Sequence, residues 1–142
     1  MKEILKIGFV GTAISPYYAE EQEVRKNSEI QLKRMLKNFD VELISFHKTI
    51  FSKEDSIEAE KFLKNKVDFL LIQTSSCSSG EQLYPLCNIS SKIGIWAVPD
   101  IEKEGGVKLH SLVSTSHYLG IIKKTLSDRK IKTKWFYNYA DT

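Results

Sequence analysis

Short apolar runs alternate with amphipathic segments along the whole chain, and this alternation restricts the fold more than any other feature. Apolar runs typical of buried strands lie at residues 4–10, 41–46, 69–72, 93–98 and 135–139. Apolar residues with helical spacing lie between them, at residues 20–39, 52–63, 83–87 and 112–126. Strands that alternate with helices build a parallel sheet with helices on both faces.

We therefore predict one α/β domain over residues 1–142, with a three-layer, doubly wound parallel sheet of the flavodoxin/Rossmann-like type. Right-handed crossovers and five strands favour the order 2-1-3-4-5. The length suits one domain, and contents of 42% hydrophobic and 27% charged residues are ordinary for a globular protein.

Helical periodicity also predicts which side chains pack on the sheet. In the first helix these are Leu32, Met35, Leu36 and Phe39; in the second, Ala59, Phe62 and Leu63; in the fourth, Leu112, Leu119, Ile122 and Leu126. Ser52 and Asp55 are spaced as a capping box that starts the second helix. Cys87 falls on a helical stripe, where cysteine is usually buried.

The charge balance argues against a nucleic-acid-binding protein. A net charge of +3 comes from 21 basic and 18 acidic residues, and the basic cluster from Lys123 to Lys134 fits the solvated end of a helix. No apolar run approaches the roughly 20 residues that cross a bilayer, so we predict no membrane contact. No signal-peptide pattern precedes the first strand, so we expect a cytoplasmic protein with free thiols at Cys77 and Cys87.

A ligand in this fold is expected at the carboxyl ends of the strands, where strand order reverses. The loops there, at residues 11–18, 73–80 and 99–100, are rich in hydroxyl groups that suit a neutral polyol such as a sugar. Serine and threonine also cap helices and close turns for purely local reasons. The candidate ligand-binding residues are Thr12, Ser15, Tyr17, Thr74, Ser75, Cys77 and Asp100.

Other site chemistries lack their motifs. Neither GxGxxG nor GxxxxGK[ST] occurs, which argues against dinucleotide and P-loop sites. A phosphatase reaction at Cys77 would require an arginine six residues later, where Leu83 stands. The three histidines, His47, His110 and His117, have no metal-binding spacing, so we predict no metal site within this chain.

Three segments together resemble the N-terminal region of the L-fucose/L-arabinose isomerase family. They are IGIWAVPD at 93–100, LHSLVSTSHYLGIIKK at 109–124 and KWFYNYAD at 134–141, in the family's order. The resemblance implies a Rossmann-like domain that builds subunit interfaces and helps to cover the sugar. It implies that manganese and the aldose–ketose chemistry belong to later domains, so this chain alone has no catalytic residues and no cofactor.

The same resemblance makes His117 the first choice for a sugar contact, with Ser114 and Ser76 near it. Two departures weaken any inference about which sugar is bound. His110 replaces the asparagine often found where the helix block begins, and Thr115-Ser116 replaces another frequent pair.

Three functions are therefore open. The first is a module of a sugar isomerase that forms a homo-oligomer or joins a separate catalytic chain. Rings among Trp135, Phe136, Tyr137 and Tyr139 that point outwards from the last strand would form the interface. The alternative is that helices cover both faces of this strand and bury the rings. The second is an independent flavodoxin-like binding protein or small enzyme that uses the Ser/Thr/Cys loop after the third strand. The third is an inactive remnant.

Overall fold

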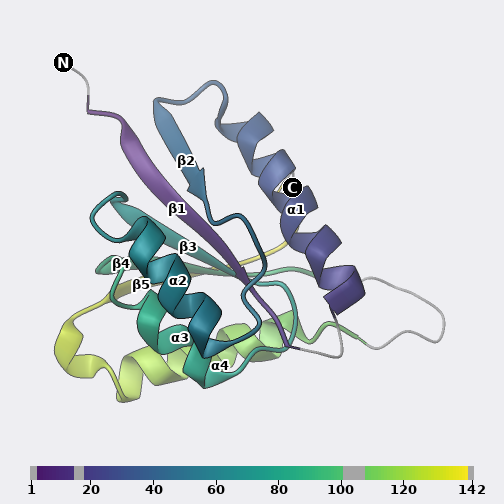
Figure 1. Cartoon of the computed structure of the whole chain (residues 1–142), viewed down its shortest axis with the longest axis vertical. Helices are drawn as coiled ribbons and strands as arrows, with labels where there is room; N and C mark the ends of the chain where they lie inside the picture. The colour runs from purple at the N-terminus through teal and green to yellow at the C-terminus, as the bar shows by residue number, and fades with distance from the viewer. Residues whose placement is uncertain (1–2, 15–17, 101–107, 141–142) are drawn as a thin grey trace.

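A computed structural model describes residues 3–14, 18–100 and 108–140 (Figure 1). One parallel sheet has the order β2-β1-β3-β4-β5, which confirms the predicted fold class and strand order. Its strands are β1 (Leu5–Thr12), β2 (Val41–Ser45), β3 (Phe69–Thr74), β4 (Lys92–Ala97) and β5 (Lys132–Tyr137). The helices are α1 (Tyr18–Leu36), α2 (Lys53–Leu63), α3 (Gly80–Leu86) and α4 (Ser111–Lys124), followed by the 3-10 turn η1 (Ser127–Arg129).

The strand register brings three chain segments to one edge of the sheet. Thr12 pairs with Thr74, and Thr74 pairs with Ala97, so β1, β3 and β4 end side by side. Their following loops therefore meet at the carboxyl edge, where the predicted ligand loops belong.

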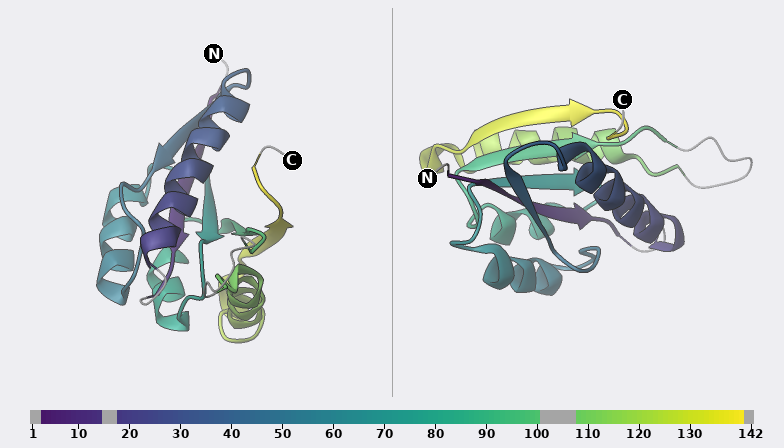
Figure 2. Two further views of the ribbon diagram at one scale, coloured as in Figure 1. Left: turned by 90° about the vertical axis from the view of Figure 1, so that its right-hand side faces the viewer. Right: turned by 90° about the horizontal axis from the view of Figure 1, so that it is seen from above.

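The two faces of the sheet are covered unequally. Helices α2, α3 and α4 lie together along one face, whereas α1 lies apart from them over β1 and β2 (Figures 1 and 2). The larger core is on the side of α2–α4 and includes Val10, Leu70, Ile72, Ile93, Ile95, Leu83 and Tyr118. The smaller core, on the α1 side, is built on Phe9, Trp96, Val98 and Leu109.

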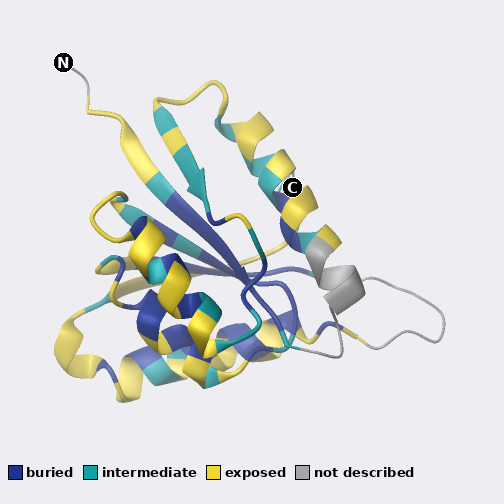
Figure 3. Ribbon diagram, in the orientation of Figure 1, coloured by how far each residue is buried: buried dark blue, intermediate teal, exposed yellow. Residues whose placement is uncertain are grey.

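Several predicted core positions are wrong because α1 does not cover the whole of its face. Met35 is 46% exposed and Phe39 is 66% exposed, although helical spacing placed them on a buried stripe. The alternative of a last strand covered by helices on both faces does not hold, because every residue of β5 is exposed, as Figure 3 shows in yellow. On the other face, Phe62 and Leu112 are also exposed, whereas Ala59, Leu63, Ile122 and Leu126 are buried as predicted.

Local capping follows the sequence closely. The backbone N–H of Asp55 donates to Ser52 Oγ at 3.1 Å, and Asp55 Oδ2 accepts the N–H of Phe51 at 3.0 Å. Ser52 therefore caps α2, as its spacing from Asp55 predicted. Within the described residues, no helix has the length and apolar character needed to cross a membrane.

Candidate functional site

The hydroxyl groups at the carboxyl edge divide into two sets with opposite surroundings. Those facing α2–α4 hydrogen-bond to one another. Thr12 Oγ1 lies 2.9 Å from Ser78 Oγ, and the buried hydroxyl of Tyr118 donates to the carbonyl of Ser79 at 3.2 Å. Burial raises the pKa of Tyr118 to about 12, so this phenol stays protonated and acts as a donor.

On the same α2–α4 side, Thr74 is the centre of another group of hydrogen bonds, which fastens α4 to the sheet. Its Oγ1 lies 2.7 Å from Thr115 Oγ1 and 3.1 Å from Ser111 Oγ. Ser111 Oγ in turn accepts the N–H of Val98 at 2.9 Å and donates to the carbonyl of Thr74. These buried hydroxyls already have partners within the protein, so their arrangement is explained by packing.

The residues predicted to contact a sugar are not equally accessible. Ser114 is buried, and its Oγ accepts the N–H of Ser78 at 2.7 Å. Ser76 is also buried and donates to the carbonyl of Cys77 at 3.1 Å. His117 is exposed, and its Nε2 would lie 3.2 Å from a Cβ built at Gly80. His117 therefore reaches solvent near the start of α3, while the two serines do not.

The other predicted loop residues have mixed positions. Ser75 is buried, and its Oγ donates to Gln73 Oε1 at 2.8 Å. Cys77 is half-buried and free. Asp100 is exposed, and its Oδ1 accepts the N–H of His110 at 3.1 Å. The predictions at Ser15 and Tyr17 lie outside the described residues.

The α1 side of the same edge contains polar groups that lack partners. Among the described residues, four buried side-chain atoms make no hydrogen bond, and all come from α1, from the ends of β2 and β3, or from the loop after β2. They are Arg25 Nε, Ser45 Oγ, Thr49 Oγ1 and Gln73 Nε2. A buried donor without an acceptor is costly, so each such atom in a folded protein requires an explanation.

Arg25 holds the central position on this side. It is only 8% exposed, and a Cβ at Gly11 would lie 2.6 Å from its Cγ, so β1 runs directly beneath the arginine stem. One guanidinium nitrogen donates to Glu29 at 3.0 Å and to the carbonyl of Phe46 at 3.4 Å. Sequence reasoning missed Arg25, although it lies seven residues before Leu32 and hence on the same face of α1.

A pocket of about 400 Å³ opens beside this arginine, at the carboxyl end of β2. Its volume falls within the roughly 300–1,000 Å³ typical of small-molecule sites. It is lined by Arg25, Lys26, His47, Lys48, Thr49, Phe51 and Asp55.

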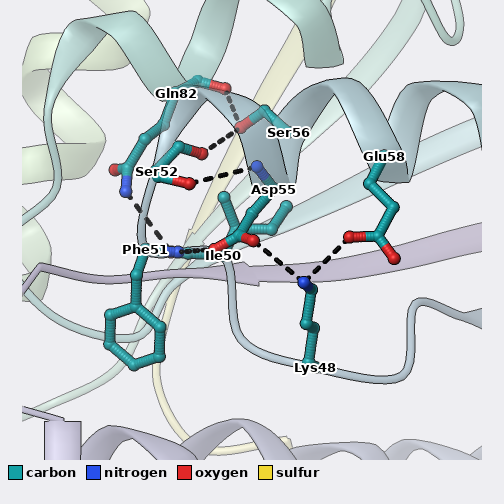
Figure 4. A network of polar contacts seen from close by, with 8 residues as sticks. All are labelled: Lys48, Ile50, Phe51, Ser52, Asp55, Ser56, Glu58 and Gln82. Atoms are coloured by element: carbon teal, nitrogen blue, oxygen red, sulfur yellow. Dashed lines mark hydrogen bonds and ion pairs between the residues drawn. The ribbon is translucent and has the colours of Figure 1, made fainter.

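Two carboxylates hold the lysine of this pocket (Figure 4). Lys48 Nζ lies 2.9 Å from Asp55 Oδ1 and 2.8 Å from Glu58 Oε2. Hydrogen bonds to Glu58 and Asp55 raise the pKa of Lys48. Burial alone would raise the pKa of Asp55, but the bonds from Lys48 and from the N–H of Phe51 outweigh it and lower that pKa. Both groups are therefore charged at neutral pH.

A second hollow is apolar and lies where α1 stops covering the sheet. We call it the apolar groove; its volume is about 470 Å³. The ring of Phe136 packs against Gly94 at one side of the groove, since a Cβ built there would lie 3.0 Å from Phe136 Cε2. Trp96 Nε1 donates to the carbonyl of Asn138 at 2.7 Å. The groove is lined by Ile7, Leu32, Met35, Leu36, Leu43, Phe69, Leu71, Trp96, Phe136, Tyr137, Asn138, Tyr139 and Ala140.

The aromatic residues of the third resembling segment flank this groove or lie next to it. Trp135, Phe136, Tyr137 and Tyr139 are all exposed. Exposed apolar patches of this kind commonly mark interaction surfaces.

No group of three or more His, Cys, Asp or Glu side chains in the described part of the chain could hold a metal ion. No family model matches this sequence, and no curated protein matches it. The likeness to sugar isomerases is therefore carried by the three sequence segments alone.

Proposed function

We propose that this domain is a non-catalytic module of an aldose–ketose isomerase-like protein. In this role it supplies a subunit interface and covers part of a sugar pocket. The observation that carries the interface is the apolar groove beside α1, with exposed rings of β5 at its border. A water-exposed surface of this composition is stabilised when another protein covers it.

The occupant we propose for the groove is a second copy of this chain. Within the part of the chain that the structure describes, strand β5 is at the edge of the sheet and pairs on one side only, with β4. An edge strand offers unpaired backbone donors and acceptors to a neighbouring chain. Two copies related by a twofold axis would bring the same surface together from both sides.

The position of His110 is consistent with the resemblance. Its φ of 54° lies in the left-handed region at the start of α4. Asparagine adopts this conformation more readily than most residues, and asparagine is what the resembling family often has here. A sugar contact at His117 is supported by its exposure and its place one helical turn after Ser114, beside Gly80.

The alternative of an independent enzyme that uses the Ser/Thr/Cys loop is less well supported. The buried hydroxyls of Thr74 and Ser78 are bonded within the protein, and so are not free to bind a substrate. No base is hydrogen-bonded to the Cys77 thiol among the contacts of the described residues.

Sedimentation of the purified chain over a wide concentration range tests the interface. We expect concentration-dependent association that Phe136→Lys abolishes, because a charge in the groove opposes burial. Val113→Lys, at an exposed apolar position of α4, is the matched control and should associate like the wild type. A wild-type chain that is monomeric throughout would overturn the proposed occupant.

Melting against a panel of aldoses and ketoses tests the pocket role. A sugar that binds the folded state raises the melting temperature, and His117→Ala should remove that rise. Manganese alone should cause no shift. A manganese shift without sugar would contradict the module and point to a metal site of its own.

A further inference from the structure

We propose that the pocket at the carboxyl end of β2 binds a small ligand through an oxyanion, either a phosphate or a carboxylate group. This site is separate from the apolar groove: the two share no lining residue. Its existence therefore does not depend on the isomerase module proposed above.

The first argument is the hydrogen-bonding capacity left unused in the pocket walls. Thr49 is 4% exposed, lines the pocket, and its Oγ1 has no partner. Arg25 lines the same pocket, and its Nε has no partner either. The Nε–H group can only donate, and a threonine hydroxyl can donate. An acceptor is the kind of partner that could satisfy both groups.

The second argument is charge. Lys48 is engaged by Asp55 and Glu58, and Arg25 by Glu29. Lys26 also lines the pocket, and no ion pair or hydrogen bond of its side chain occurs within the described residues. An oxyanion would add charge-assisted bonds to Lys26 and to the Nε–H of Arg25, which are stronger than bonds between neutral groups.

The third argument is the rigidity of the walls. Arg25 is held by Glu29 and by the carbonyl of Phe46, while Asp55 is fixed by bonds at the start of α2. Ser56 Oγ donates to the carbonyl of Gln82 at 2.7 Å and ties α2 to α3 (Figure 4). Donors held in place before a ligand arrives lose little entropy on binding.

Calorimetric titration of the full chain at constant ionic strength tests the site, with inorganic phosphate and acetate as separate probes and chloride as the blank. We expect saturable binding of at least one probe. Phosphate alone would identify a phosphate site, and acetate alone a carboxylate site. No saturable binding of either probe would overturn the proposal.

Variants locate the binding. Thr49→Val keeps the side-chain shape and removes the hydroxyl, and Lys26→Met removes the charge. Each should weaken binding at least about tenfold, the usual effect of losing one bond to a charged group. Lys37→Met, an exposed lysine just after α1, should bind like the wild type. If Thr49→Val keeps its fold by circular dichroism and binds the anion with unchanged affinity, the anion does not bind in this pocket.

Discussion

The side-chain oxygens of Thr74 and Thr115 lie 2.7 Å apart in the core, although the two residues are 41 positions apart in the chain. This contact fixes α4 against the end of β3. It also uses a hydroxyl that stands at the position where an α/β sheet normally receives its ligand. The consequence is that the carboxyl edge on the α2–α4 side is a packed interior.

The contrast between Thr74 and Thr49 gives a direct stability prediction. Thr74→Val leaves the buried groups of Ser111 and Thr115 short of a partner and should lower the free energy of unfolding by about 1–3 kcal/mol. Thr49→Val removes a hydroxyl that has no partner, so stability should stay equal or rise slightly. Urea unfolding of both variants measures the difference. Equal losses would mean that the two hydroxyls have similar surroundings, contrary to the structure.

Much of the fold follows from local patterns in the sequence. Apolar runs located the strands of the sheet, and the Ser52–Asp55 spacing located the start of α2. The strand order followed from general rules on crossovers and parallel sheets. These features depend on neighbouring residues and on chain topology, both of which the sequence displays.

The candidate site was harder to predict, because it depends on which polar side chains find hydrogen-bond partners far away in the sequence. The loop after β3 was located correctly, yet Thr74 bonds to residues 37 and 41 positions away, so its engagement was invisible in the sequence. Arg25 lies on a helical face whose periodicity suggests apolar packing. Met35 and Phe39 are exposed because no described helix covers the sheet beyond α1, and periodicity contains no information about that coverage.

Gly11 should resist substitution because of the arginine above it. A Cβ there would lie 2.6 Å from Arg25 Cγ and 2.9 Å from Ser75 Oγ, so Gly11→Ala forces the buried arginine to move. Overpacking of this kind costs about 1–3 kcal/mol. Loss of oxyanion binding should accompany the loss of stability, since Arg25 lines the pocket.

Gly120 is the matched control for this substitution. It lies within α4, and a Cβ there would meet nothing within 4 Å. Gly120→Ala should raise stability by about 0.5–1 kcal/mol, because alanine favours the helix over glycine. Calorimetric melting of the two variants would disagree with the structure if both shifted in the same direction.

The pocket carboxylate Asp55 should make stability depend on acid pH. Its pKa is lowered in the folded state from an ordinary value of 3.8, so ionised Asp55 stabilises the fold above that value. The contribution is lost as the pH falls through the folded pKa. Asp55→Asn should therefore be less stable than wild type at neutral pH by about 0.3–1 kcal/mol, the usual value for an anion in the first turn of a helix.

The same two proteins should become equally stable toward about pH 2, where the carboxyl of the wild type is protonated. Urea unfolding at a series of pH values checks this convergence. Glu29, whose pKa is also lowered, titrates in both proteins and cancels in the comparison. A stability difference that persists unchanged in acid would show that the charge of Asp55 is not what stabilises α2.

The two cysteines should react at very different rates. Burial raises the pKa of Cys87 to about 11, against a weaker opposing effect of Arg129, and its thiol is almost fully shielded. The thiolate is the reactive form, and at about pH 8 roughly one Cys87 in a thousand carries it. Cys77 is half-buried in the loop after β3. Iodoacetamide should therefore modify one site in the native chain, and mass spectrometry should place it at Cys77.

The variant Cys77→Ser is the control, and its native form should stay unmodified until urea exposes Cys87. Comparable labelling of both thiols in the native protein would contradict the packing of α3 against the sheet.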